Sequence, residues 1–232
     1  MKQDQVIEQK TSMGSYILAI IALGSICGLI EVVAGGYLKQ AGFPYRAGLL
    51  IGLGFALVAL GMAIFRKPIM AVYLGLIAAL SKQLAVVILH LPALCMANST
   101  LAVILEYGAL AAIATAAFGT TQKSLRSRII VGGASGFVGS LAFYFIGMQV
   151  APCNYLLSFN SSAGFVSYLY QESVSWALFP LVFFPLGWFV GVKISEKSLT
   201  FLNSKPQFYY AGTLITTAIC WISCAIAIIN GI

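Results

Sequence analysis

Seven long apolar stretches run through the 232-residue sequence and constrain its fold more than any other feature. Each is close to the roughly 20 residues that a helix needs to cross the hydrocarbon core of a bilayer. Only 8% of the residues are charged, whereas a soluble domain carries about 25%. The sequence therefore predicts an all-α, polytopic membrane bundle of about seven transmembrane helices. The predicted spans are Ser15–Leu38, Tyr45–Phe65, Pro68–Leu91, Ser99–Thr120, Ile129–Val150, Glu172–Val192 and Phe208–Asn230.

The same pattern predicts the domain organisation. Residues 1–14 are expected to form a short cytoplasmic tail, and residues 15–232 a single transmembrane helical domain. The first apolar run is too long for the apolar region of a cleavable signal peptide, so we expect a spanning helix there. The net charge of +7 does not indicate a nucleic-acid partner, because the basic residues lie in short loops.

Lysine and arginine placement predicts the orientation, because cytoplasmic loops of membrane proteins are enriched in these residues. With the N-terminus in the cytoplasm, ten basic residues fall on the cytoplasmic side and only Lys39 and Arg46 fall outside. Lys82 is left within the membrane. Seven spans then place the C-terminus outside. We expect a multi-pass protein of a prokaryotic cytoplasmic (inner) membrane, surrounded by lipid.

Four charged residues fall within or at the edge of the apolar stretches: Glu31, Lys82, Glu106 and Glu172. Ionised side chains are costly in hydrocarbon, so residues of this kind usually face protein or water and have a function. At about 1.5 Å per residue, Glu31, Lys82 and Glu106 lie about 10–13 Å below the outer ends of their helices. Glu172 opens the sixth stretch on the outer side. The sequence therefore predicts a polar site in the outer half of the bundle.

The neighbours of these charges indicate what such a site would bind. Three carboxylates face one ammonium, so an amine-bearing or cationic ligand, a metal ion or a proton would balance the charge. Trp176 and Tyr168 lie near Glu172 in the sequence, and a flat cationic ring can stack on aromatic side chains of this kind. A second interpretation needs no ligand: Lys82 pairs with Glu106 or Glu31 and locks the bundle, and Glu172 is a solvated acid at a helix N-terminus.

Several kinds of chemistry are not expected. No nucleophile and base are spaced as a catalytic set, so we expect no enzyme, and nothing in the sequence calls for a cofactor. Cys95 and Cys153 fall in predicted outer loops and would form a disulfide if the outside is oxidising. His90, Cys95, Met96 and Cys153 are an alternative set of ligands for a soft metal, although their spacing matches no recognised metal motif.

The first stretch carries small residues at four-residue spacing, Ser15 and Ala19 and then Gly24 and Gly28. This spacing is similar to the Ala-xxx-Ala contact that the substrate-binding S component of an energy-coupling factor transporter makes with its membrane partner, and short segments of the chain resemble that family. Further similarities are the Arg66-Lys67-Pro68 turn, the stretch Leu101–Leu110 and the final Gly187–Lys193. The seventh stretch is one more than the six helices usual in that family.

The resemblance implies a mechanism and partners. An S component captures a vitamin-like or metal solute at its outer side and then topples in the membrane on a T component driven by two cytoplasmic ATPases. The site would contain Glu31, Lys82, Glu106, Glu172, Trp176 and Tyr168 beneath the Met148–Tyr170 connection. Ser15, Ala19, Gly24 and Gly28 would contact the partner helix.

Two other functions remain open from the sequence. One is a structural or assembly subunit of a larger membrane complex, which would use its small-residue faces for protein contacts and its charges for internal pairing. The other is an ion- or proton-coupled transporter in which Glu31 and Glu106 change protonation. Unaided transporters often show internal repeats and broken helices, and neither is evident in this sequence.

Overall fold

The structure is a computed structural model that describes residues 13–231, without the side chains of Ala93, Cys95, Leu199 and Asn203. Within these residues, seven helices are long and apolar enough to cross a membrane, which confirms the predicted helical membrane bundle. The tail of residues 1–12 lies outside the described residues. The spanning elements are α1 (Met13–Leu29), which continues through a π-helical turn (Ile30–Ala34) into α2 (Gly35–Gln40); α3 (Arg46–Phe65); α4 (Met70–Ile88); α5 (Ala97–Ala116); α7 (Leu125–Val150); α9 (Ser162–Tyr168), which continues through a π-helical turn (Leu169–Ser173) into α10 (Val174–Ser204); and α11 (Pro206–Ile229).

Three short elements connect these spans. A 3-10 turn (Ala93–Met96) precedes α5, α6 (Phe118–Lys123) lies between α5 and α7, and α8 (Asn154–Leu157) lies between α7 and α9. The turn between α3 and α4 contains Arg66 in the left-handed conformation, with φ of 54°. Its backbone N–H bonds to the carbonyl of Met62, which closes the end of α3.

The sixth spanning helix is longer than the sequence predicted. The span predicted over Glu172–Val192 lies within it, but the helix begins earlier, with α9 at Ser162, and ends later, with α10 at Ser204. The connection also contributes to the core, because Leu156 and Tyr168 are almost completely buried. Burial of large side chains of this kind is favourable by roughly 1.5–3 kcal/mol each, which explains why this segment folds onto the bundle.

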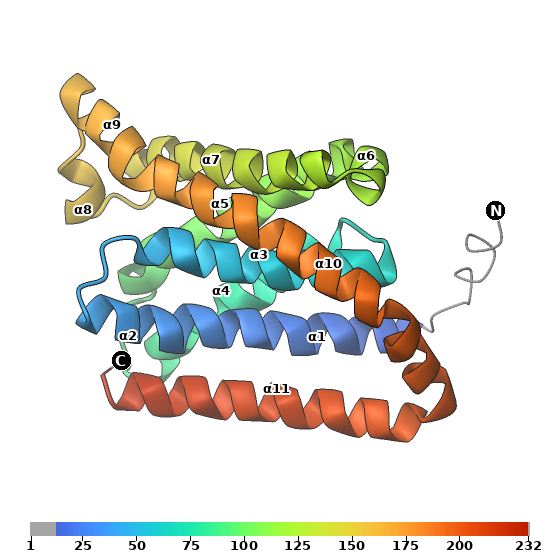
Figure 1. Cartoon of the computed structure of the whole chain (residues 1–232). Helices are drawn as coiled ribbons and strands as arrows, with labels where there is room; N and C mark the ends of the chain where they lie inside the picture. The colour runs from blue at the N-terminus through green and yellow to red at the C-terminus, as the bar shows by residue number, and fades with distance from the viewer. Residues whose placement is uncertain (1–12, 232) are drawn as a thin grey trace.

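The centre of the bundle is α3, and α10 crosses it at a close distance (Figure 1). Glycines permit this approach: a Cβ atom on Gly187 of α10 would lie 2.6 Å from the Cα atom of Ala56 on α3. The glycine-rich α7 approaches α10 in the same way, since a Cβ atom on Gly132 would lie 2.9 Å from the Cβ atom of Phe184. Small residues therefore bring the helices together, as they commonly do in membrane bundles.

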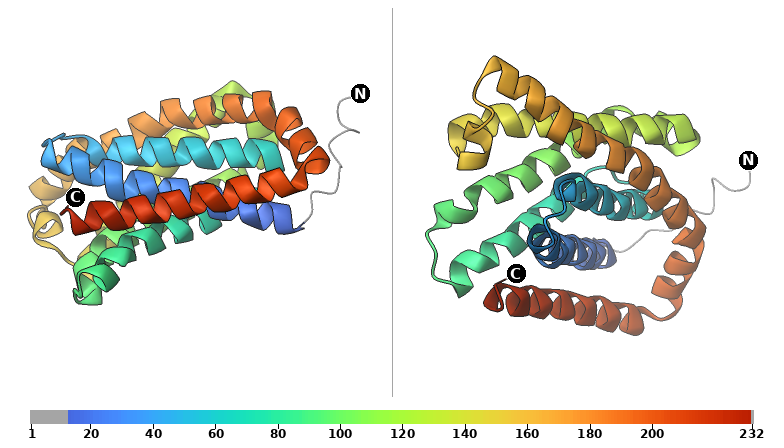
Figure 2. Two further views of the ribbon diagram at one scale, coloured as in Figure 1. Left: turned by 90° about the horizontal axis from the view of Figure 1, so that it is seen from below. Right: turned by 60° about the vertical axis from the view of Figure 1, so that its left-hand side comes forward.

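The seventh spanning helix, α11, lies on the outside of the bundle against α1 and α4 (Figures 1 and 2). The Tyr209 hydroxyl donates to the backbone carbonyl of Ser15 at 3.2 Å, and Trp221 Nε1 donates to the hydroxyl of Ser25 at 2.9 Å. The helix α1 begins at one end of the bundle, and α11 ends at the other, beside the turn between α2 and α3 (Figure 1).

Candidate functional site

A cavity of about 390 Å³ lies at the end of the bundle where α2 turns into α3. Four spanning segments converge there: the π-helical turn and α2, the first turns of α3, the last turns of α4 and the first turns of α5. Trp176 of α10 and Ile228 of α11 complete the wall. The charged residues that line it are Glu31, Lys39, Arg46, Lys82 and Glu106. We call this space the end cavity.

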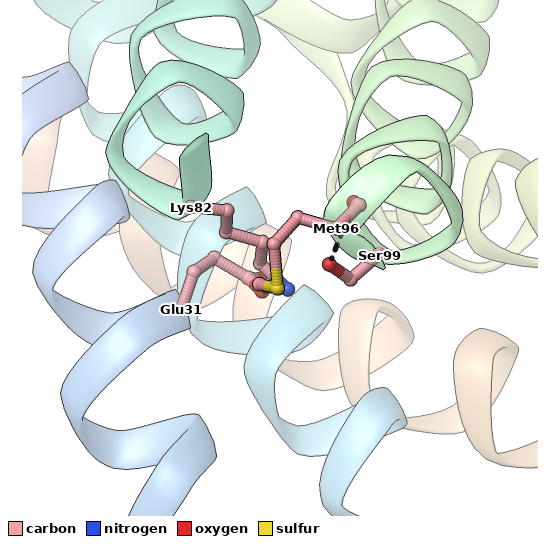
Figure 3. A network of polar contacts seen from close by, with 4 residues as sticks. All are labelled: Glu31, Lys82, Met96 and Ser99. Atoms are coloured by element: carbon pink, nitrogen blue, oxygen red, sulfur yellow. Dashed lines mark hydrogen bonds and ion pairs between the residues drawn. The ribbon is translucent and has the colours of Figure 1, made fainter. Parts of the chain in front are cut away.

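Glu31 and Lys82 form an ion pair in the wall of the end cavity. Lys82 Nζ lies 2.8 Å from Glu31 Oε2, and the two side chains are 15% and 5% exposed. Figure 3 shows the two side chains meeting between α1 and α4, with Met96 and Ser99 of the α5 end nearby. The alternative pairing of Lys82 with Glu31, which the sequence left open, is therefore the one observed. This pair has no net charge, so it does not by itself require a ligand.

The position of Glu31 depends on a π-helical turn that the sequence did not predict. The turn over Ile30–Ala34 interrupts the α-helical hydrogen bonding between α1 and α2. Turns of this type appear mostly as single turns inside α-helices and frequently at functional sites. A second π-helical turn, Leu169–Ser173, carries Glu172. Two of the three predicted site glutamates therefore lie in such turns, and no local sequence signal identified them.

Glu106 reaches the end cavity from α5 and is only 2% exposed. Its Oε1 atom has no hydrogen-bond partner among the described residues. The helix α7 closes over its backbone, because a Cβ atom on Gly139 would lie 2.9 Å from the Cα atom of Glu106. A buried polar group without a partner costs about 1–3 kcal/mol, and more when it is charged. Glu106 is thus an unsatisfied acceptor that borders an open space.

Trp176 lines the end cavity, whereas Glu172 does not. Glu172 instead accepts hydrogen bonds from Trp176 Nε1, at 3.2 Å, and from the Tyr155 hydroxyl. The Trp176 ring stacks on Phe143 with centroids 5.7 Å apart. Burial and the hydrogen bond to Glu172 raise the pKa of Tyr155, so this phenol stays a neutral donor. Glu172 therefore holds the orientation of Trp176 from outside the cavity.

Tyr168 is also outside the end cavity. It is 1% exposed, and its hydroxyl donates to the Ser140 carbonyl at 3.1 Å. The prediction that the Met148–Tyr170 connection covers the site is wrong, because no residue of this connection lines the cavity. Its aromatic side chains pack on α7 instead: the rings of Tyr144 and Tyr168 lie 4.8 Å apart.

Lys39 and Arg46 are the site residues that sequence reasoning missed. Both are exposed, both line the end cavity, and they flank the turn between α2 and α3. A signal was present, because they are the only two basic residues assigned to the outer side. Because the loop bias does not account for basic residues on the outer side, these two could have been considered for a role in the site.

The four small residues of α1 pack within the chain and do not offer a free face to a partner. Ser15 and Ala19 are 2% and 6% exposed. A Cβ atom on Gly24 would lie 2.8 Å from Ile77 Cβ, and one on Gly28 would lie 2.6 Å from Ser81 Cβ. These residues seat α1 against its neighbouring helices, so in this structure they are buried within the chain.

The cysteine alternatives receive no support from the geometry. Cys153 is a free thiol, and the side chain of Cys95 lies outside the described part of the chain. Among the side chains that the structure describes, no three His, Cys, Asp or Glu residues gather in a way that could hold a metal ion.

Comparisons with protein-family models, with curated proteins and with solved structures found no match to this chain.

Proposed function

We propose that the chain is an integral membrane protein that binds a small, amine-bearing solute in the end cavity and serves as a subunit for its transport. One observation carries the proposal: Glu106 is buried, lacks a partner for Oε1 and borders the cavity. An ammonium group placed there would donate a charge-assisted hydrogen bond to this carboxylate, and such bonds are roughly twice as strong as neutral ones.

The remaining wall of the end cavity suits a small organic ligand. Its volume of about 390 Å³ falls within the roughly 300–1,000 Å³ of small-molecule sites. Most of the lining is apolar, and Leu50, Ile51 and Val103 contribute to it. Trp176 is fixed by Glu172 and Phe143, so it presents a rigid ring to a ligand.

A transport role is supported by the location of the cavity. It lies within a spanning bundle, at the end that the lysine and arginine count predicts to face outward. In this proposal the protein acts like the S component of an energy-coupling factor transporter and works with a membrane partner and cytoplasmic ATPases. Because α1 is already packed against α4 and α11, such a partner would contact a different face of the bundle.

Native mass spectrometry of the purified full-length protein tests the proposal. We expect a small molecule of fixed mass to remain on the wild-type protein and to be lost from Glu106→Gln. Glu196→Gln is the matched control, because Glu196 is an exposed residue of α10 outside the end cavity. Equal retention by all three proteins would show that the bound molecule does not depend on Glu106, and a protein without any bound molecule would contradict the proposal directly.

A structural subunit is the second candidate, and the Glu31–Lys82 ion pair favours it. This pair joins α1 to α4 without help from a ligand. A protein that carries no small molecule, and that is recovered from membranes only with other membrane chains, would support this function instead.

A further inference from the structure

The charges of the end cavity are arranged in two levels. At the deep level, Glu31 and Lys82 neutralise each other and Glu106 remains unpaired. At the mouth, Lys39 and Arg46 are exposed, and neither forms an ion pair within the part of the chain that the structure describes. The deep level thus holds one carboxyl group without a partner, and the mouth carries two positive groups.

The two levels are separated by about two helical turns. Lys39 follows Glu31 by eight residues along the first spanning segment, and Glu106 follows Ser99, which also lines the cavity, by seven residues along α5. At about 1.5 Å per residue, these spacings correspond to roughly 10–12 Å along the bundle. These spacings are between backbone positions, and Lys39, Arg46 and Glu106 all line the cavity with their side chains between the two levels. A small molecule whose ammonium and carboxylate groups lie only a few ångströms apart can therefore contact both levels.

A ligand with a single kind of charge would be poorly matched to this arrangement. A simple cation would have to pass Lys39 and Arg46, and the repulsion would lower its local concentration at the mouth. A simple anion would be attracted by the mouth but would meet Glu106 at the deep level. Only a molecule that carries both charges is matched at both ends, and electrostatic matching of this kind gives specificity.

We propose that the ligand of the end cavity is a zwitterion of the amino-acid type, with its ammonium group on Glu106 and its carboxylate on Arg46 and Lys39 at the mouth. The proposal rests on the proposed function and specifies its substrate class. Arg46 suits this role because a guanidinium group can bind a carboxylate through two parallel hydrogen bonds.

Thermal unfolding of the full-length protein in nanodiscs of neutral lipid provides the test. The probes are the common α-amino acids and γ-aminobutyrate, each compared with its decarboxylated amine and its deaminated acid. We expect at least one amino acid to stabilise the protein, with a dissociation constant about tenfold below those of its amine and its acid, the factor given by one charge-assisted hydrogen bond.

Substitutions then test which residues bind each end of the ligand. Lys39→Gln combined with Arg46→Gln should lower the affinity for the amino acid to the affinity for its amine. Glu106→Gln should lower the affinities for both the amino acid and the amine about tenfold or more. Lys193→Gln combined with Lys197→Gln is the matched control, because both are exposed residues of α10 that do not line the end cavity. This control should leave both affinities unchanged.

The outcomes separate this inference from the proposed function. If an amine binds as tightly as its amino acid, the zwitterion is overturned and the amine-binding site stands. If no probe binds but native mass spectrometry finds a bound compound, the charged groups of that compound test the inference. A compound with both an amine and an anionic group supports the zwitterion, and a compound without an anionic group overturns it. If no probe binds and the protein is empty, both proposals are overturned.

Discussion

Gly28 of α1 lies against Ser81 of α4 so closely that a Cβ atom on the glycine would be 2.6 Å from the Cβ atom of the serine. Glu31 follows Gly28 by three residues, and Lys82 follows Ser81 directly. The contact between Gly28 and Ser81 therefore sets the separation of the two helices at the point where the 2.8 Å ion pair forms. A packing residue in α1 thereby determines the geometry of the cavity wall.

The first prediction concerns this contact. Gly28→Ala forces α1 and α4 apart, and overpacking of this kind typically costs about 1–3 kcal/mol. We expect a lower unfolding midpoint in detergent and weaker retention of any bound ligand. Gly108→Ala is the control, because nothing lies within 4 Å of a Cβ atom at that position on α5. Its midpoint should be unchanged or higher, since alanine is favoured over glycine in a helix by about 0.5–1 kcal/mol. Equal effects of the two substitutions would contradict the role of Gly28.

The number and extent of most spanning helices could be predicted from the sequence, because apolar run length is set by bilayer thickness. The helix α9 could not, because Ser162–Tyr168 reads as polar and aromatic yet is held by tertiary contacts such as those of Tyr168 with Ser140. Glu31, Lys82 and Glu106, which the sequence placed at similar depths, all line the end cavity.

Other parts of the site depend on the direction in which a side chain points, and the length of an apolar stretch does not predict this direction. Glu172 was assigned to the site by its depth, but it lies in a π-helical turn outside the cavity, where it accepts hydrogen bonds from Trp176 Nε1 and the Tyr155 hydroxyl. The balance of charge was also misjudged. Three acids against one base were expected, whereas two acids and three bases line the end cavity, because Glu172 is absent from the wall and Lys39 and Arg46 are present.

The second prediction concerns the hydrogen bond from Tyr155 to Glu172. Burial and this bond raise the pKa of Tyr155 above its usual value of 10.0, so the folded protein keeps the proton at a pH where the unfolded chain releases it. Its contribution to stability is therefore complete below about pH 10 and is lost as the pH rises above that value. Because Tyr155 is 45% exposed, solvent screening keeps the effect small.

The measurement is the unfolding midpoint of the wild type and of Tyr155→Phe between neutral pH and pH 11. The variant should be slightly less stable at neutral pH and should lose less stability as the pH rises, so the two curves should converge. Parallel curves would contradict the assignment of a raised pKa to Tyr155.

The third prediction concerns the Glu31–Lys82 ion pair. Lys82→Met leaves the Glu31 carboxylate buried without its partner, and breaking a buried pair in this way costs about 3–5 kcal/mol. Adding Glu31→Gln to Lys82→Met should restore much of the loss, because the double variant buries no unpaired charge. A double-mutant cycle measured by chemical denaturation provides the coupling energy. Additive effects of the two substitutions would show that the side chains do not interact in solution.

The fourth prediction separates a ligand-binding Glu106 from a structural one. In the ligand-free protein the buried carboxyl group has an oxygen without a partner, so Glu106→Gln replaces an incompletely paired carboxyl group by a neutral amide of the same shape. We expect the variant to be as stable as the wild type, or more stable by about 1 kcal/mol, while it loses ligand binding; functional residues are often optimised for activity at the expense of stability. The measurements are the unfolding midpoint after extensive washing and the retention of small molecules in native mass spectra. If Glu106→Gln instead destabilises the washed protein by several kcal/mol, as the loss of one member of a buried ion-pair network would, then Glu106 belongs to the framework that locks the bundle.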